Sequence, residues 1–205
     1  TFEVVVHRCI WTTLILLIST TFFNKWHIFK EIIINKKKLF LLLITSFLIF
    51  GNWTIWIYAV ATNRIIDASF GYFIFPILSV FFGFIFFKEK LNKKRIISII
   101  LVMISTIYLL FNLDSLPWIG FAVAFLWSIY NLLRKKINVD TDIGLLIESL
   151  FIFPLAVIIL YLIIQNNVND FSLSNPSLIA LLFLAGPMTV IPLFLYVKGV
   201  ELSGL

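Results

Sequence analysis

Seven long apolar runs, separated by short polar connectors, dominate the chain. They occupy residues 4–23, 39–60, 68–87, 96–111, 118–133, 143–164 and 178–197. As an α-helix, a run of twenty residues covers about 30 Å, which is the thickness of the hydrocarbon core of a bilayer. A buried helix of a soluble protein can account for one such run but not for seven in succession. The pattern therefore predicts an all-α integral membrane domain, a polytopic bundle of seven transmembrane helices.

The third run, residues 68–87, has two different faces. Small or polar residues recur at steps of three and four and so share one side of the helix, whereas the opposite side is Phe, Ile, Leu and Val. The small or polar residues are Ser69, Tyr72, Pro76, Ser79 and Gly83. In lipid, this side is expected to meet other helices or a cavity. It is either a helix-packing seam or the lining of a substrate path.

Composition agrees with a membrane protein and narrows the chemistry. Charged residues make up only 13% of the chain and hydrophobic residues 61%, which leaves too little polar surface for a soluble domain of 205 residues. The single cysteine, Cys9, rules out an internal disulfide and a cysteine-based metal cluster. The sequence has no Gly-rich phosphate loop, no HExxH and no Gly-x-Ser-x-Gly motif. We therefore expect no cofactor, no metal and no enzymatic reaction.

Lysines and arginines concentrate in alternate connectors. Residues 24–38, 88–95 and 134–142 hold 13 of the 16, and the connectors between them contain only Arg64. The positive-inside rule places the three basic connectors in the cytoplasm, so the first run crosses from outside to inside. Nucleic-acid binding, the other explanation for a net charge of +6, does not predict this alternation. The chain starts at Thr1 with no recognisable signal peptide, and we expect one further span before the first run.

Four ionisable residues lie within the runs or at their edges: His7, Arg8, Asp67 and Glu148. Charged groups are costly in hydrocarbon, so each is a functional candidate. Arg8, close to the outer end of its run, can instead reach the outer lipid headgroups. Glu148 has apolar neighbours near the cytoplasmic end of the sixth run. It is either a proton carrier or the partner of a neighbouring helix in a structural hydrogen bond or ion pair.

Polar and aromatic side chains share faces of two further runs. Asn52 and Trp56 are four residues apart in the second run, and Asn131 lies on a stripe of small and aromatic residues in the fifth. Amide and aromatic groups facing a cavity suit small, partly apolar organic molecules. Trp53 and Trp118 can instead belong to the aromatic belts at the membrane interfaces.

A faint internal repeat relates the two halves of the chain. The run 4–23, with His7 and Arg8, overlays the run 143–164, with Glu148, so that the polar groups are in register. By the charge rule, these two runs cross the membrane in opposite directions. Inverted repeats are typical of transporters that bind their substrate near the midplane, at the interface between the repeats.

Six stretches in order along the chain form a more specific pattern. They are Asn52-Trp53, Asp67-Ala68-Ser69-Phe70-Gly71-Tyr72-Phe73-Ile74-x-Pro76, Phe86-Phe87-x-Glu89-x-Leu91, Leu133-Arg134-Lys135-Lys136, Glu148, and Leu184-Ala185-Gly186-Pro187-x-Thr189-x-x-Pro192. Together they resemble the RarD-type proteins, a branch of the EamA group in the drug/metabolite transporter superfamily. Two positions depart from that pattern: Phe75 stands where the family usually has Asn, and Asp67 where it often has Glu.

The resemblance implies a ten-helix carrier of the bacterial inner membrane, built as five plus five inverted helices. This chain then matches helices two to eight. Residues 1–112 are helices two to five of the first EamA-type repeat, and residues 113–205 are the first three helices of the second, so the chain is expected to be truncated at both ends. The substitution at Phe75 removes a polar group from its helix face.

Residues and resemblance together predict a secondary transporter that exports small organic solutes, such as drugs or amino-acid-like metabolites, by alternating access. Glu148 is the expected proton-coupling group or partner of a substrate amine, and His7 and Arg8 the expected receptors of an anionic group. Lining roles fall to Asn52, Trp56, Tyr72 and Asn131. Packing or hinge roles fall to Gly71, Pro76, Gly83, Gly186, Pro187 and Pro192.

Two rival functions stay open, a non-transporting assembly subunit and, with less support, a membrane-embedded enzyme. The expected partners are the lipid bilayer and a small-molecule substrate, without nucleic acid, and a homodimer is compatible with the sequence.

Overall fold

The computed structural model describes residues 2–113, 116–166 and 176–203, and this part of the chain is entirely helical. The helices are α1 (Phe2–Phe22), α2 (Trp26–Ile34), α3 (Lys36–Ala61), α4 (Ile65–Phe87), α5 (Lys93–Phe111), α6 (Trp118–Ile137), α7 (Thr141–Gln165) and α8 (Pro176–Ser203). Among these described helices, α1, α3, α4, α5, α7 and α8 are long and apolar enough to cross a membrane. The predicted polytopic helical membrane fold is therefore confirmed.

Two helices differ from the predicted pattern of apolar runs. The short helix α2 lies inside the basic connector 24–38, which was expected to be a plain loop. The fifth predicted run forms α6, which has 20 residues but is not among the six apolar helices. The reason is its composition, because Asn131 and the basic residues of its last turn, Arg134, Lys135 and Lys136, lower the mean hydropathy of the helix. It packs closely against α3 and α4.

The helix ends follow local chain chemistry. Asn35 and Asn92 cap α3 and α5, since their side chains accept hydrogen bonds from the backbone N–H groups of Lys38 and Arg95. Helix α4 stops abruptly at Lys88, which takes a left-handed backbone conformation with φ of 53°.

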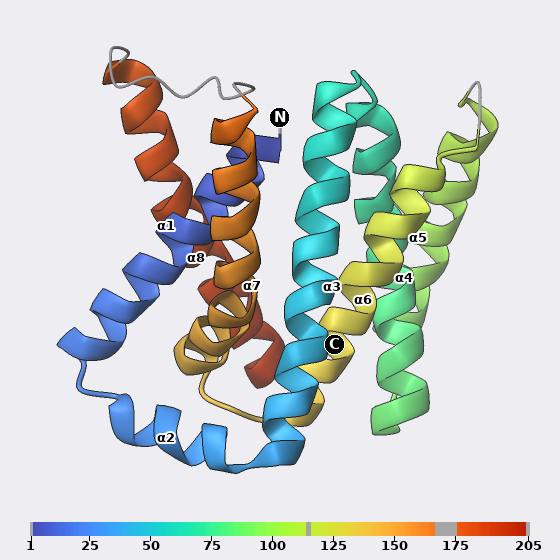
Figure 1. Cartoon of the computed structure of the whole chain (residues 1–205). Helices are drawn as coiled ribbons and strands as arrows, with labels where there is room; N and C mark the ends of the chain where they lie inside the picture. Colours follow the sequence, from blue (N-terminus) through green and yellow to red (C-terminus); the bar gives the residue numbers. More distant parts are fainter. Residues whose placement is uncertain (1, 114–115, 167–175, 204–205) are drawn as a thin grey trace.

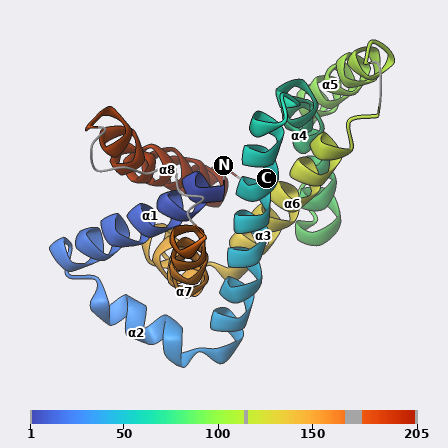
Figure 2. The ribbon, with the colours of Figure 1, turned by 45° about the horizontal axis from the view of Figure 1, so that its top comes forward.

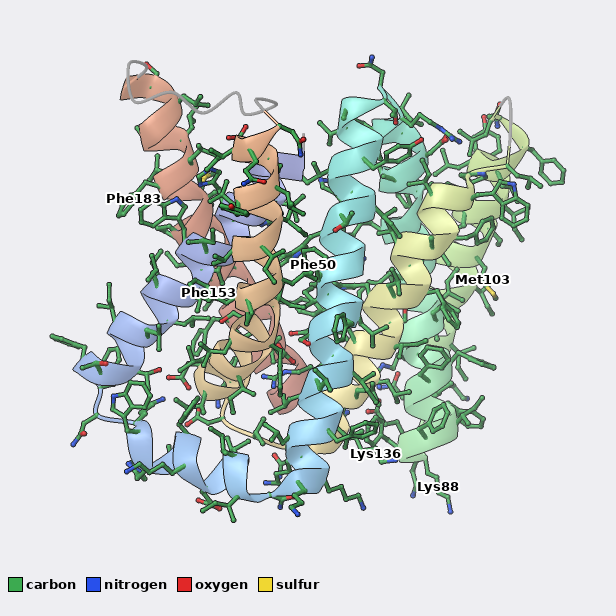
Figure 3. The ribbon with its side chains drawn as sticks, in the orientation of Figure 1. Phe50, Lys88, Met103, Lys136, Phe153 and Phe183 are labelled. Atoms are coloured by element: carbon green, nitrogen blue, oxygen red, sulfur yellow. The ribbon has the colours of Figure 1, made fainter. Side chains whose placement is uncertain are left out.

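The spanning helices form two groups (Figures 1 and 2). Helices α1, α7 and α8 pack together on one side, and α3, α4, α5 and α6 on the other. At one end of the bundle α2 crosses between α1 and α3 (Figure 1). Lys88 and Lys136 lie at this same end (Figure 3), which we call the basic end because connectors 24–38, 88–95 and 134–142 meet there.

A hydrophobic core joins the two groups. Leu16 of α1, Leu146 of α7 and Val197 of α8 pack in one buried cluster with Ile49 of α3 and Tyr130 of α6. Because helices from both groups share this cluster, the bundle is one membrane domain. The apolar exterior is extensive, as expected for a surface that faces lipid rather than water.

Close helix crossings depend on glycine. A Cβ atom added to Gly71 of α4 would lie 2.6 Å from the carbonyl oxygen of Gly120 on α6, so this crossing has no room for a side chain. A Cβ added to Gly186 of α8 would meet Trp11 and Ile15 of α1. Gly51 of α3 differs, because the nearest atom to an added Cβ is Leu126 Cδ1 at 3.7 Å, an ordinary contact distance.

The Gly71 crossing yields a test of packing. We expect Gly71→Leu to destabilise the protein by about 1–3 kcal/mol or more, because the side chain forces α4 away from the backbone of α6. Gly51→Ala is the matched control and should change stability little. Thermal unfolding of the purified protein in detergent, followed by size-exclusion chromatography, measures both. Equal melting temperatures for the two variants would contradict the close crossing.

Candidate functional site

A cavity of about 300 Å³ lies between the two helix groups. One wall comes from α1 and α8, and the other from α3, α4 and α6. We call this space the central cavity. Its lining residues are Arg8, Asn52, Trp53, Trp56, Tyr72, Trp127, Met188, Thr189, Pro192, Leu193 and Tyr196. Five of these eleven side chains are Trp or Tyr, so aromatic residues are the largest group in the lining.

Arg8 is the positive charge of the central cavity. Its Nε donates a hydrogen bond to Thr189 Oγ1 at 2.6 Å, and its guanidinium carbon lies 4.6 Å from the ring centroid of Trp53. These contacts direct the side chain into the bundle rather than toward the headgroups. Within the described residues no carboxylate lies within ion-pair distance of Arg8. A desolvated arginine in this setting favours an anionic ligand.

Aromatic contacts fix the shape of the α3–α4–α6 wall and join it to α8. The rings of Trp56 and Tyr72 meet edge to face with centroids 5.4 Å apart, and those of Trp127 and Tyr196 lie 5.3 Å apart. Phe75, the position that departs from the family pattern, packs against Tyr196 at 6.2 Å. The aromatic side chain at this position therefore contacts the lining of the cavity without being part of it.

Asn52 ties the lining of α3 to α6. Its Nδ2 donates to the backbone carbonyl of Val123 at 3.0 Å. The side chain thus holds two helices of the same group together and presents a polar edge to the cavity.

Glu148 does not line the central cavity. Its carboxylate accepts hydrogen bonds from Thr45 Oγ1 at 2.6 Å and Tyr130 Oη at 3.2 Å, and its Oε1 lies 3.7 Å from Nε of Arg134. Only 3% of Glu148 is exposed. We call these four residues the Glu148 cluster. The predicted ion pair and hydrogen bonds to neighbouring helices are therefore present, and the role of Glu148 as a proton carrier stays a prediction.

Arg134 is the residue that the sequence analysis placed wrongly. It was counted in a cytoplasmic basic connector, yet only 2% of it is exposed. Its Nη2 donates to the carbonyl of Thr141 at 3.3 Å, and its guanidinium lies so close to Gly144 that a Cβ atom there would overlap it. Counting charges in a loop cannot detect such burial. The available signal was the unpaired Glu148, which needs a cation on an adjacent helix.

The Glu148 cluster approaches the central cavity through a small space. Glu148 lines a pocket of about 20 Å³, on the scale of one water molecule. That pocket shares Trp53 and Leu193 with the central cavity. The two polar centres therefore have a common wall.

The other predicted site residues have separate positions. His7 is buried beside Glu3, with 3.9 Å between Nε2 and Oε1, and does not line the cavity. Asn131 is buried and donates to the carbonyl of Trp127 at 2.8 Å. Asp67 pairs with Arg64 at 2.6 Å, away from the basic end.

Of the seven predicted substrate-binding residues, the structure brings together Arg8, Asn52, Trp56 and Tyr72 in one cavity. Trp127 belongs to the stripe of small and aromatic residues that was predicted with Asn131. Trp53, Thr189 and Tyr196 were not predicted to line a cavity, although Trp53 and Thr189 stand in the motifs that resemble the family.

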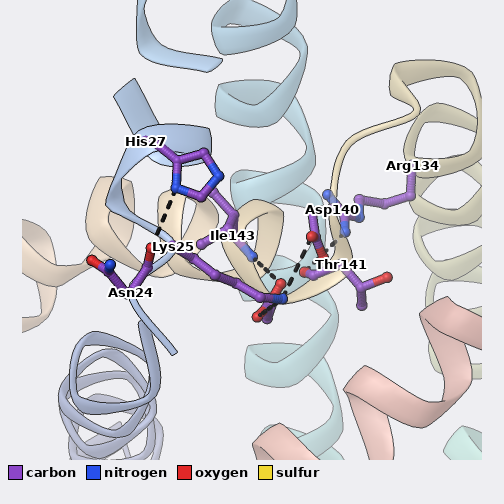
Figure 4. Close-up of polar contacts among 8 residues, drawn as sticks. Asn24, Lys25, His27, Arg134, Asp140, Thr141 and Ile143 are labelled. Atoms are coloured by element: carbon purple, nitrogen blue, oxygen red, sulfur yellow. Dashed lines mark hydrogen bonds and ion pairs between the residues drawn. The ribbon is translucent and has the colours of Figure 1, made fainter. Parts of the chain in front are cut away.

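Ion pairs close the basic end. Lys25 Nζ lies 2.7 Å from Asp142 and 3.5 Å from Asp140 (Figure 4). Burial opposes the charge of Lys25, but its bonds and attraction to Asp142 and Asp140 outweigh burial and raise the pKa of the ammonium group. A hydrogen bond with Asp142, and burial, raise the pKa of Asp140. Glu89 pairs with both Arg95 and Lys135. The pairs of Lys25 link the α1–α2 connector to the start of α7. The pair of Glu89 with Lys135 links the α4–α5 connector to α6.

Comparison with known proteins agrees with this architecture. The profile of the EamA-like transporter family matches residues 1–111. "Protein RarD" of Escherichia coli is 33% identical over 194 residues, which are 95% of this chain and 66% of that protein. "Uncharacterized transporter YojE" of Bacillus subtilis is 32% identical over 202 residues, which are 97% of this chain and 67% of that protein.

A third relative, an "Uncharacterized transporter" of Vibrio cholerae, is 34% identical over 95% of this chain and 64% of its own length. This chain thus spans about two thirds of the length of these relatives. No solved structure matches. The family profile covers more than half of the chain, and nearly the whole chain is similar to RarD proteins and uncharacterised transporters. The chain therefore belongs to the EamA-like transporter family as a RarD-type member.

Proposed function

We propose that this protein is a secondary transporter that exports small organic anions across the bacterial inner membrane by alternating access. The observation that carries the proposal is the central cavity, which lies between two helix groups and contains Arg8 without a carboxylate partner among the described residues. An intramembrane cation facing a cavity is a substrate-binding group by default. Transport also accounts for a site that offers binding groups but no nucleophile–base pair.

The lining defines the preferred substrate. Arg8 offers a planar guanidinium whose Nε is held by Thr189, so the remaining N–H groups can bind a carboxylate or a similar anion. Trp56, Tyr72 and Trp127 offer aromatic faces to an apolar body. His7 and Asn131 act in this proposal as positioning residues, Asn131 through its bond to the backbone of Trp127.

Alternating access requires the two helix groups to separate first at one end and then at the other. Near the basic end, Glu148 of α7 bonds to Thr45 of α3 and to Tyr130 and Arg134 of α6. Each of these contacts of Glu148 thus crosses between the two groups. In this proposal, protonation of Glu148 removes its charge, weakens the bonds and lets the basic end open, which couples proton movement to transport.

The rival function, a non-transporting assembly subunit, predicts that the polar lining is dispensable. A membrane-embedded enzyme predicts turnover of a lipid. The following experiments separate these functions from transport.

Arg8 tests the substrate site. In bacteria stripped of their own exporters, the protein should lower the accumulation of labelled organic acids, and an uncoupler should restore it. Arg8→Gln should weaken this export about ten-fold or more, because a charged hydrogen bond contributes about 1.5–3 kcal/mol. Arg64→Gln, an exposed arginine paired with Asp67 outside the cavity, is the control. Unchanged export in Arg8→Gln would overturn the assignment of Arg8, and no export of any acid by the intact protein would favour the assembly subunit.

Glu148 tests the coupling. We expect Glu148→Gln to abolish the response of export to the proton gradient, and to lower the melting temperature because Arg134 stays buried without its counter-ion, at a cost of about 3–5 kcal/mol. The double variant Glu148→Gln/Arg134→Met should recover stability but not coupling. Glu31→Gln, an exposed carboxylate on α2, is the control. If coupling returns with stability in the double variant, the cluster is structural only.

The proposed orientation has a direct check. In a Cys9→Ala background, Ala61→Cys should react with a membrane-impermeant maleimide in intact spheroplasts, whereas Lys37→Cys should react only after permeabilisation, because the basic end faces the cytoplasm. Both side chains are exposed. Labelling in the reverse order would invert the topology.

A further inference from the structure

A second cavity lies under α2 and is separate from the central cavity. It has a volume of about 260 Å³, and six residues of α2, α3 and α7 line it. They are Phe29, Ile33, Leu39, Ile147, Leu150 and Phe151. All six are apolar, and none lines the central cavity. We call this space the α2 groove.

Helix α2 has the features of a helix that lies in a membrane interface. It crosses the basic end rather than running with the spanning helices (Figure 1). Ile32 is buried against the bundle, whereas Lys30 and Glu31 on the other side are exposed. Ile34 is 79% exposed, which is favourable at the level of lipid but not in water. The α2 groove therefore opens where the headgroups of a bilayer meet its acyl chains.

Four lysines are close in sequence to residues that line the α2 groove. Lys30 follows the lining residue Phe29, and Lys36, Lys37 and Lys38 directly precede the lining residue Leu39. None of the four has an ion-pair partner within the described residues.

We propose that the α2 groove binds an anionic phospholipid from the cytoplasmic leaflet, with one acyl chain in the groove and the phosphate against Lys36, Lys37 and Lys38. The apolar lining suits a hydrocarbon chain and excludes a polar solute. The lysines supply the charge complementarity for a phosphate, as basic clusters at the cytoplasmic face of membrane helices do. Glu31, the acidic residue of α2, would repel a ligand that carries a carboxylate. The lipid would hold α2 against α7, independently of what the central cavity carries.

Photo-crosslinking tests this site directly. The protein is reconstituted in vesicles of phosphatidylcholine with a small fraction of phosphatidylglycerol that carries a diazirine in one acyl chain. After illumination, mass spectrometry should find the label enriched several-fold on the peptides with Ile33, Leu150 and Phe151, relative to the exposed helix α5. Unlabelled phosphatidylglycerol should displace the label, and further phosphatidylcholine should not.

Matched variants separate the headgroup from general charge. Replacing Lys36, Lys37 and Lys38 by Gln should weaken the displacement by phosphatidylglycerol at least about five-fold. The reason is that a single lysine near an anionic headgroup already raises the affinity about five-fold. Replacing the exposed Lys90, Lys93 and Lys94 by Gln removes the same charge from another connector and should change nothing. Ile33→Trp should lower labelling by filling the groove.

Three outcomes would overturn the proposal. Label spread evenly over all lipid-facing helices would show ordinary annular lipid, and equal displacement by phosphatidylcholine would remove the role of the lysines. Absence of label from Ile33, Leu150 and Phe151 would show that protein covers the groove. These readouts do not require transport, so they stand or fall separately from the transport experiments.

Discussion

The bilayer offers no water to satisfy a polar group, and this constraint governs the whole structure. Each spanning segment satisfies its backbone by forming a helix, and each buried ionisable side chain needs a partner within the protein. Glu148 shows the strongest form of this rule, because it collects a threonine, a tyrosine and an arginine from two other helices. Its bonds tie one helix group to the other at the basic end.

Two arginines inside the bundle, the buried Arg134 and the half-buried Arg8, have opposite surroundings. Arg134 lies against Glu148 and the backbone near Gly144, so its charge is balanced within the protein. Arg8 contacts a hydroxyl and an aromatic ring, and no carboxylate of the described residues lies within ion-pair distance of it. In the proposed mechanism, Arg134 closes the basic end and Arg8 receives the substrate. Both functions follow from the high cost of an unbalanced charge in a low-dielectric region.

Close helix packing builds each of the two helix groups. Without water between helices, association depends on close contact, and the crossings at Gly71 with Gly120 and at Gly186 with α1 bring backbones together. Mainly aliphatic side chains then fill the interface between the groups, and aromatic side chains line the central cavity within it. The ion pairs of Lys25 with Asp140 and Asp142 restrain the connectors at the basic end without occupying that interface.

The sequence by itself determined the long apolar helices, their membrane character and the alternation of basic connectors, because the length and polarity of a span depend only on local residues and on the bilayer. It also identified Asn52, Trp56 and Tyr72 from helical periodicity and Arg8 from the cost of a charge in hydrocarbon. Only the tertiary structure decided that Arg134 is buried against Glu148, that Trp127, Thr189 and Tyr196 complete the cavity, and that α2 covers an apolar groove. Each of these depends on contacts between residues far apart in the chain, and local pattern carries no information on which helix faces meet.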